Sequence, residues 1–246
     1  MAERSSCPAA PAPRRRAGIV AALAREARPL GRAVRAARPV ALDDGSLLAL
    51  SGMGAAAAAA AARALIDEGA SALASWGFAG GLDPALPPGC VLLPDEVLSA
   101  TGEALATTAA WRAPLARALQ DLPLGAGRLI TSVAPLGSVE QKAACRRATA
   151  AVAVDMESFP VGSVAREHRL PFVCVRVIVD AAGDAVPPAL LQALSTPQLQ
   201  LGRLLRELLL APAQWGALVR LASCERAARR SLRAIAQRAS LTACLP

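Results

Sequence analysis

The chain has 246 residues, enough for one large domain with its own hydrophobic core. Hydrophobic residues make up 54% of it, which excludes a chain that is disordered throughout. The net charge of +8 lies at the two ends: residues 1–16 carry +3 and residues 187–246 carry +6, which leaves residues 17–186 at −1.

A basic head and tail are compatible with nucleic-acid binding. Aromatic residues, however, make up only 2% of the chain, and we find no nucleic-acid motif, so we expect no nucleic-acid partner. The six cysteines form no CxxC pair, so we expect no metal site and favour a reducing cytoplasm.

Residues 1–16 are rich in Pro, Ala and Arg, and we predict a disordered leader there. This stretch lacks the apolar region of a signal peptide. No apolar run in the sequence is long and charge-free enough to span a bilayer.

Strand-like and helix-like segments then alternate. Short apolar runs predict strands at 18–23, 47–50, 71–76, 90–93, 97–100, 129–132, 152–154 and 172–179. We predict helices from about 24 and at 55–68, 111–120, 138–149 and 157–169, with a capping box of Ser138 and Gln141 opening the fourth. This alternation predicts a three-layer α/β/α sandwich over residues 17–186, built on a central mixed, mostly parallel sheet.

After Pro187 and Pro188 the pattern becomes purely helical to about residue 237, so residues 187–246 form a predicted helical extension, packed on or beside the domain. Residues 199–237 are rich in Leu and Arg. Two interpretations stay open: a basic amphipathic segment in a bilayer interface, or helices that cover the sheet or form a dimer interface.

In a parallel α/β sheet, ligands gather at the carboxyl ends of the strands. Four candidates fall there: Glu26, the Gly-rich turn predicted at Gly77–Gly81, the acidic run Asp155–Glu157, and Asp180. Each also has an ordinary structural explanation, because turns need glycine and acidic residues stabilise the start of a helix.

Taken together, these segments resemble a known family. They are Gly18–Glu26, Ser51–Gly54, Gly77–Leu82, Val154–Glu157 and Pro171–Asp180. In order and spacing they are similar to the nucleoside phosphorylase and nucleosidase superfamily, and especially to its methylthioadenosine/S-adenosylhomocysteine nucleosidase branch. The resemblance implies an enzyme that breaks the N-glycosidic bond of a purine nucleoside.

The resemblance also assigns catalytic roles that make chemical sense. Breaking the bond creates an oxocarbenium-like sugar and a purine that needs a proton. Asp180 is expected to donate that proton, while Glu26 orients and deprotonates the attacking water and Arg176 lies nearby to hold Glu26 or the nucleophile. Two carboxylates with separate duties follow the division of labour known from other glycosidases.

The resemblance implies that Glu157 accepts hydrogen bonds from the ribose hydroxyls and that Met156 packs against the sugar. The full set of expected substrate contacts is Met156, Glu157, Gly54, Phe78, Ala79, Gly80 and Phe159. We expect no metal and no cofactor, with water, or else phosphate, as the co-substrate.

Some positions depart from the family pattern. Phe78 and Val179 stand where the family often has small or hydroxyl residues, and Phe159-Pro160 follows the Met-Glu pair where small residues are common. These apolar side chains either line a hydrocarbon slot or belong to the core. The Gly77–Gly81 segment has no phosphate-binding arginine, which favours hydrolysis over phosphorolysis without deciding between them.

Within the superfamily, the chain is most similar to the hopanoid-associated phosphorylase-like proteins. The features are Asp155–Ser158, the Leu-Pro-Phe strand entry at 170–172, and the tail with Pro187-Pro188, Pro212 and Gln214. This similarity implies removal of adenine from adenosylhopane to leave ribosylhopane in hopanoid biosynthesis. It also implies a cytoplasmic homo-oligomer in peripheral contact with the inner membrane surface through residues 199–237.

Two other hypotheses remain. One is a water-soluble methylthioadenosine/S-adenosylhomocysteine nucleosidase or a purine nucleoside phosphorylase. The other is a non-catalytic membrane or nucleic-acid adaptor on a decayed enzyme fold. Outside the candidate site, we expect His168 to be a solvated surface residue and Cys174 to be buried packing in a strand.

Overall fold

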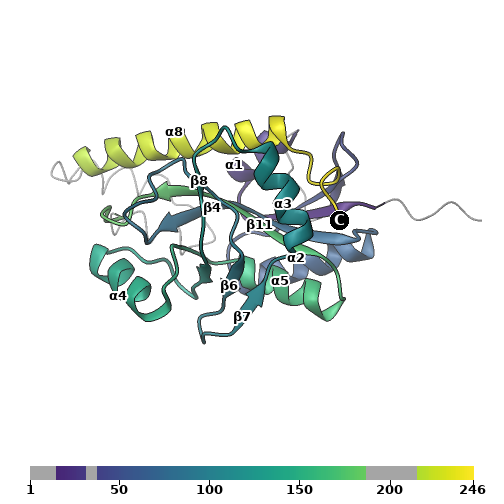
Figure 1. Cartoon of the computed structure of the whole chain (residues 1–246), viewed down its shortest axis with the longest axis horizontal. Helices are drawn as coiled ribbons and strands as arrows, with labels where there is room; N and C mark the ends of the chain where they lie inside the picture. Colours follow the sequence, from purple (N-terminus) through teal and green to yellow (C-terminus); the bar gives the residue numbers. More distant parts are fainter. Residues whose placement is uncertain (1–14, 32–37, 187–214) are drawn as a thin grey trace, which may run out of the picture.

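Helices cover both faces of a central sheet (Figure 1). The computed structural model describes residues 15–31, 38–186 and 215–246. The strands are β1 Ala17–Ala21, β2 Val40–Ala41, β3 Leu47–Leu50, β4 Ala72–Gly81, β5 Val91–Leu92, β6 Glu96–Leu98, β7 Ala104–Ala106, β8 Leu124–Gly125, β9 Leu129–Thr131, β10 Ala153–Asp155 and β11 Phe172–Asp180. The helices are α1 Ala24–Ala27, the 3-10 turn η1 Arg28–Leu30, α2 Ala55–Asp67, α3 Ala109–Ala118, α4 Val139–Thr149, α5 Ser158–Glu167 and α8 Trp215–Arg238.

The sheet runs in the order β2-β3-β1-β4-β10-β9-β6-β7, and β11 pairs with both β4 and β5. Among the described strands, β4 pairs in parallel with β1 and β11, and antiparallel with β10. Six of the ten strand pairings described are parallel. The predicted mixed, mostly parallel sheet between helical layers is confirmed.

The two faces of the sheet have separate hydrophobic cores. On one face α2 and α5 contribute fully buried side chains such as Leu65 and Val161. On the other face α3 and α8 contribute Trp111 and Leu232, also fully buried. The short side chains of the alanine-rich helix α2 let it lie close to the strands, as at Ala62.

The prediction of a turn at Gly77–Gly81 is wrong, because β4 continues as a strand through Gly81. The glycines are needed there for space rather than for a turn. A Cβ on Gly77 would lie 2.5 Å from Arg176 Nη1, and one on Gly81 would lie 2.9 Å from the Asp180 carbonyl oxygen. The glycines thus let charged groups and the β11 backbone press directly against β4.

Other departures are local. The strands β2, β7 and β8 were not predicted, and each is only two or three residues long. The helix predicted from about residue 24 is a single turn, α1, followed by a 3-10 turn that contains Pro29. The capping box of Ser138 and Gln141 is confirmed, with Gln141 N donating to Ser138 Oγ at 3.1 Å.

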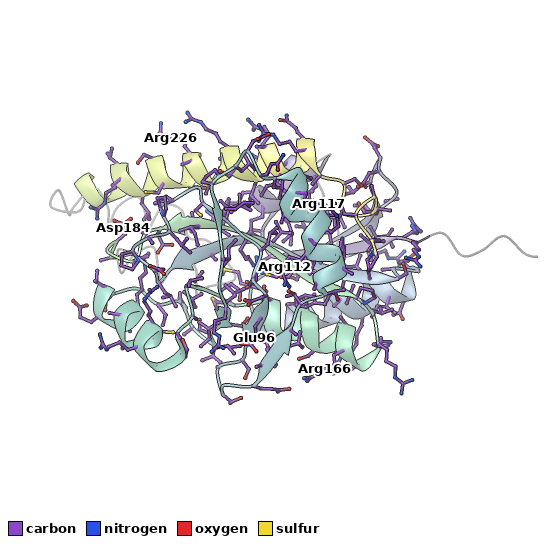
Figure 2. All side chains as sticks on the ribbon, viewed as in Figure 1. Glu96, Arg112, Arg117, Arg166, Asp184 and Arg226 are labelled. Carbon is purple, nitrogen blue, oxygen red and sulfur yellow. The ribbon has the colours of Figure 1, made fainter. Side chains whose placement is uncertain are left out.

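The described part of the C-terminal extension covers the sheet. Ala228, Leu232 and Ile235 of α8 are at most 1% exposed and pack in the core beneath it. The apolar face of α8 is therefore already occupied by the domain. Its outer face carries exposed arginines at 226, 230 and 233 (Figure 2 shows Arg226).

Of the segment predicted to contact a membrane, residues 199–214 lie outside the described residues, as do residues 1–14 of the predicted leader. None of the helices in the described ranges is both long enough and apolar enough to cross a bilayer.

Candidate active site

One pocket opens beside the carboxyl ends of β1, β4, β10 and β11, and it collects most of the residues that the sequence singled out. Its described lining is Ala22, Leu23, Arg25, Glu26, Met53, Phe78, Ala79, Gly80, Ser132, Pro135, Leu136, Val154, Asp155, Met156, Glu157, Val179, Asp180 and Val186. Four carboxylates, those of Glu26, Asp155, Glu157 and Asp180, thus belong to a lining that is otherwise largely apolar.

Glu26 is fixed by backbone amides. Its Oε2 accepts a hydrogen bond from Leu23 N at 2.9 Å, and its Oε1 accepts one from Phe78 N, also at 2.9 Å. Trp76 Nε1 donates to the Glu26 carbonyl at 2.8 Å and holds the same short helix against β4. Burial raises the pKa of Glu26 above its ordinary value, and Arg176 and these amides partly oppose that rise.

Arg176 lies behind the pocket wall and is 1% exposed. Its Nη2 is 2.6 Å from Asp155 Oδ2, and it also donates to Ser75 Oγ at 2.6 Å and to Ser158 Oγ at 2.9 Å. Its Nη1 and the Glu26 Oε1 both lie where a side chain on Gly77 would stand. The guanidinium is therefore the positive centre around which the buried carboxylates gather.

Glu157 is held by a backbone amide at the start of α2. Its Oε1 accepts a hydrogen bond from Gly54 N at 3.0 Å, at the start of α2. Burial and the neighbouring Asp155 carboxylate raise the pKa of Glu157 to about 7, while Arg176 opposes the shift. Near neutral pH the carboxyl group of Glu157 is therefore present in both its protonated and its ionised form.

Asp180 ends β11, where the register against β4 shifts between Ile178 and Asp180. Its Oδ2 accepts a hydrogen bond from the buried Lys142 of α4. Burial raises the pKa of Asp180, and the Lys142 ammonium opposes that rise. A carboxyl group with a raised pKa holds its proton further toward neutral pH, as a proton donor requires.

The structure brings Glu26, Phe78, Ala79, Gly80, Met156, Glu157 and Asp180 to the pocket lining. Arg176 and Gly54 lie behind this lining. Arg176 forms an ion pair with Asp155, and Gly54 N donates a hydrogen bond to Glu157, both of which line the pocket.

Phe159 is not among the described residues that line the pocket; it lies in the first turn of α5 and packs, partly buried, against the core. The chain turns away from the pocket because α5 begins at Ser158, whose hydroxyl contacts Arg176, and because Phe159 N donates to Thr131 Oγ1 at 2.9 Å.

Two charged residues of the site were missed. Asp155 was seen only as part of an acidic run, yet it is the ion-pair partner of Arg176. Lys142 lies 38 residues from Asp180 in a helix, and no local motif marks it. His168 is exposed and Cys174 is fully buried, as predicted. In the part of the chain that the structure describes, no cluster of His, Cys, Asp and Glu has the geometry of a metal site.

Fold and site together define an α/β protein with an acidic pocket at the carboxyl ends of a mixed sheet. The family model of the phosphorylase superfamily matches residues 41–201, about two thirds of the chain. The chain belongs to the phosphorylase superfamily. A search of curated protein sequences gave no match.

Solved structures with this fold include futalosine hydrolase of Helicobacter pylori, at 18% identity and a TM-score of 0.62, over 69% of this chain and 86% of that one. The methylthioadenosine/S-adenosylhomocysteine nucleosidase of Neisseria meningitidis, in complex with methylthio-immucillin-A, gives 24% identity and a TM-score of 0.61 over 69% and 87%. The Helicobacter pylori nucleosidase of the same name gives 16% and 0.64 over 91% and 98%. At these identities the likeness establishes the fold.

Proposed function

We propose that the chain is a nucleosidase that hydrolyses the N-glycosidic bond of a purine nucleoside. One observation carries the proposal: Glu26 and Asp180 line the same pocket, although they lie far apart in the sequence. Glu157 lies in the same lining, and we propose that it accepts hydrogen bonds from the ribose hydroxyls.

In the proposed reaction, Asp180 donates its proton to the purine as the bond to the sugar breaks. The electron pair of that bond leaves with the purine, and the sugar develops positive charge. Glu26 takes a proton from the water that attacks the sugar, helped by the two backbone amides that hold its carboxylate in place. Proton transfer by one positioned acid contributes roughly 10²–10⁴-fold to the rate.

Water is the proposed nucleophile. Glu26 provides a base next to the sugar position, whereas Arg25 is the sole arginine among the described lining residues and pairs with Glu225 of α8 at 3.5 Å. Product analysis with and without inorganic phosphate tests this choice. Free ribose-type product in both reactions supports hydrolysis, and a sugar 1-phosphate formed only with phosphate contradicts it.

For the substrate we propose a lipid-linked nucleoside, adenosylhopane, cleaved to ribosylhopane and adenine. The pocket lining supports an apolar substituent, because Leu23, Met53, Pro135, Leu136 and Val186 all contribute to it. Methylthioadenosine, with its small apolar 5′ group, is the second candidate, and it is compatible with the fold that the chain shares with solved nucleosidases.

Adenine release separates the two candidates. The assay compares adenosylhopane in mixed micelles, methylthioadenosine and S-adenosylhomocysteine at equal concentrations. We expect the highest kcat/KM with adenosylhopane. Rapid turnover of methylthioadenosine without turnover of adenosylhopane contradicts the lipid substrate but keeps the nucleosidase. No adenine from any of the three contradicts the nucleosidase and favours the non-catalytic alternative.

We further propose that the enzyme meets such a substrate at a membrane surface as a homo-oligomer. The exposed Arg226, Arg230 and Arg233 give α8 a basic outer face. At about 1 kcal/mol per arginine near anionic lipid, replacing all three with Gln weakens vesicle binding by about 3 kcal/mol. Sedimentation with phosphatidylglycerol and phosphatidylcholine vesicles measures this, and equal binding to both contradicts the electrostatic contact.

A further inference from the structure

The chain contains twenty-six arginines and a single lysine, Lys142. This lysine lies on α4 and is 1% exposed, among the most deeply buried side chains of the described residues. Arginine serves almost every other basic position in the sequence. The one position that keeps lysine is therefore a place where an ammonium group does something that a guanidinium group does not.

The surroundings of Lys142 show what that is. Its Nζ donates to Asp180 Oδ2, to the Ala181 carbonyl at 2.7 Å and to the Asp184 carbonyl at 2.9 Å. An ammonium group has three N–H donors, and three oxygens use all of them. A planar guanidinium cannot direct three donors from a single nitrogen at converging oxygens.

We propose that Lys142 is a positioning residue for Asp180, whose ammonium holds the carboxyl group against the purine and stabilises the charge left when Asp180 gives up its proton. The inference rests on the proposed nucleosidase function. In that step the O–H bond of Asp180 breaks as an N–H bond forms on the purine. Lys142 gives up no proton in this step, and it is not among the described residues that line the pocket.

Lys142 helps the reaction because its interaction with Asp180 strengthens as the proton is transferred. Before proton transfer Asp180 is neutral, and its attraction to the ammonium is weak. As the proton leaves, a full negative charge forms in a buried site, directly against a fixed positive charge. An interaction that strengthens along the reaction lowers the barrier rather than merely tightening binding.

Lys142 also limits how far burial raises the pKa of Asp180. Other charged and titratable groups surround Asp180: Asp184 on its own loop, Arg220 and Cys224 on α8, and, in the pocket lining, Arg25, Glu26, Asp155 and Glu157. Asp184 raises the pKa of Asp180 slightly and is itself paired with Arg220, at 2.8 Å. Lys142 is thus the cation in direct contact with Asp180 among the described residues.

The test uses Lys142→Met, which keeps the length of the side chain and removes its charge. Arg147→Met is the matched control, because Arg147 lies exposed on the same helix. Carboxyl ¹³C NMR of aspartate-labelled protein follows the titration of Asp180, whose signal is identified by its absence in Asp180→Asn. The pH dependence of kcat and KM for adenine release is measured in parallel.

In Lys142→Met we expect Asp180 to titrate on the order of one pH unit higher, the size of effect that an opposite charge in contact has on a carboxyl. We expect the alkaline limb of kcat to move the same way, with a loss in kcat and little change in KM. Arg147→Met should change none of these. An unmoved Asp180 titration, or a kcat loss no larger than that of Arg147→Met, overturns the proposal.

Lys142→Arg provides a second variant if Lys142→Met does not fold. It keeps the charge but loses the three converging donors, so we expect Asp180 to titrate near its wild-type pH while kcat falls. Wild-type kcat in Lys142→Arg contradicts the positioning role. If the wild-type chain releases no adenine from any nucleoside, the proposed function fails, whereas the NMR titration still decides whether Lys142 controls Asp180.

Discussion

Replacing Arg176 with Met should destabilise the protein more than any surface charge substitution. Arg176 and Asp155 are each 1% exposed at the side chain, and their closest atoms are 2.6 Å apart. Removing one partner of a buried ion pair leaves the other charge without compensation, which costs about 3–5 kcal/mol. For a domain of this size, 1 kcal/mol corresponds to about 2–4 °C in Tm, so we expect Tm to fall by roughly 6–20 °C.

The loss should also depend on pH. Without Arg176, the pKa values of Glu26 and Glu157 move upward, because each carboxylate loses a nearby positive charge. The folded variant then binds more protons than the unfolded chain. Its free energy of unfolding therefore decreases as pH rises above about 4, the ordinary carboxyl pKa, more steeply than in the wild type.

Urea unfolding followed by circular dichroism at pH 5 and pH 8 measures both effects. A double-mutant cycle with Asp155→Asn isolates the pair: the double variant should lose less stability than the sum of the two single variants. Arg166→Met, at an ion pair whose side chains are at least half exposed, serves as the control and should change little. A loss below about 1 kcal/mol in Arg176→Met, the same at both pH values, would refute the reasoning.

Two further predictions concern the pocket. The pKa of Glu157 is about 7 in the folded state and ordinarily 4.5, so its contribution to stability is present at low pH and is lost as pH rises from 4.5 to about 7. Glu157→Gln should remove this part of the pH dependence of Tm. An unchanged pH dependence contradicts the raised pKa of Glu157. In Gly81→Ala, the new Cβ would lie 2.9 Å from the Asp180 carbonyl oxygen, so we expect the free energy of unfolding in urea to fall by about 1–3 kcal/mol. In the control Gly183→Ala, the new Cβ has no atom within 4 Å, and we expect no change in stability. Equal losses in the two variants would contradict the close packing at Gly81.

Local patterns were enough to predict most of the fold. The apolar run that became β11 and the capping box at Ser138 act through neighbours in sequence. The prediction of a turn at Gly77–Gly81 was wrong because it considered only the backbone freedom of glycine. Glycine is needed at position 77 for another reason, since the side chains of Arg176 and Glu26, which come from other parts of the chain, occupy the space beside it.

The sequence predicted the site residues that follow from local position, but not those that tertiary packing brings in. Residues at strand ends, such as Glu26 and Asp180, follow from a general rule about parallel sheets. Lys142 reaches Asp180 from the interior of a helix, through tertiary packing that no spacing encodes. One signal was present in the composition, since a single lysine among twenty-six arginines marks a position where the two residues are not interchangeable. Of the two interpretations left open for Phe159, its packing against the core favours a core residue over a substrate contact.

We propose that Asp180 and Glu26 act on one nucleoside held between them. The most direct test is the rate of adenine release by Asp180→Asn and Glu26→Gln, with Tm and nucleoside binding measured on the same samples. We expect both variants to fold and to bind the nucleoside, while kcat falls by about 10²–10⁴-fold in each. Adenine release within a few-fold of the wild type in either variant would contradict it.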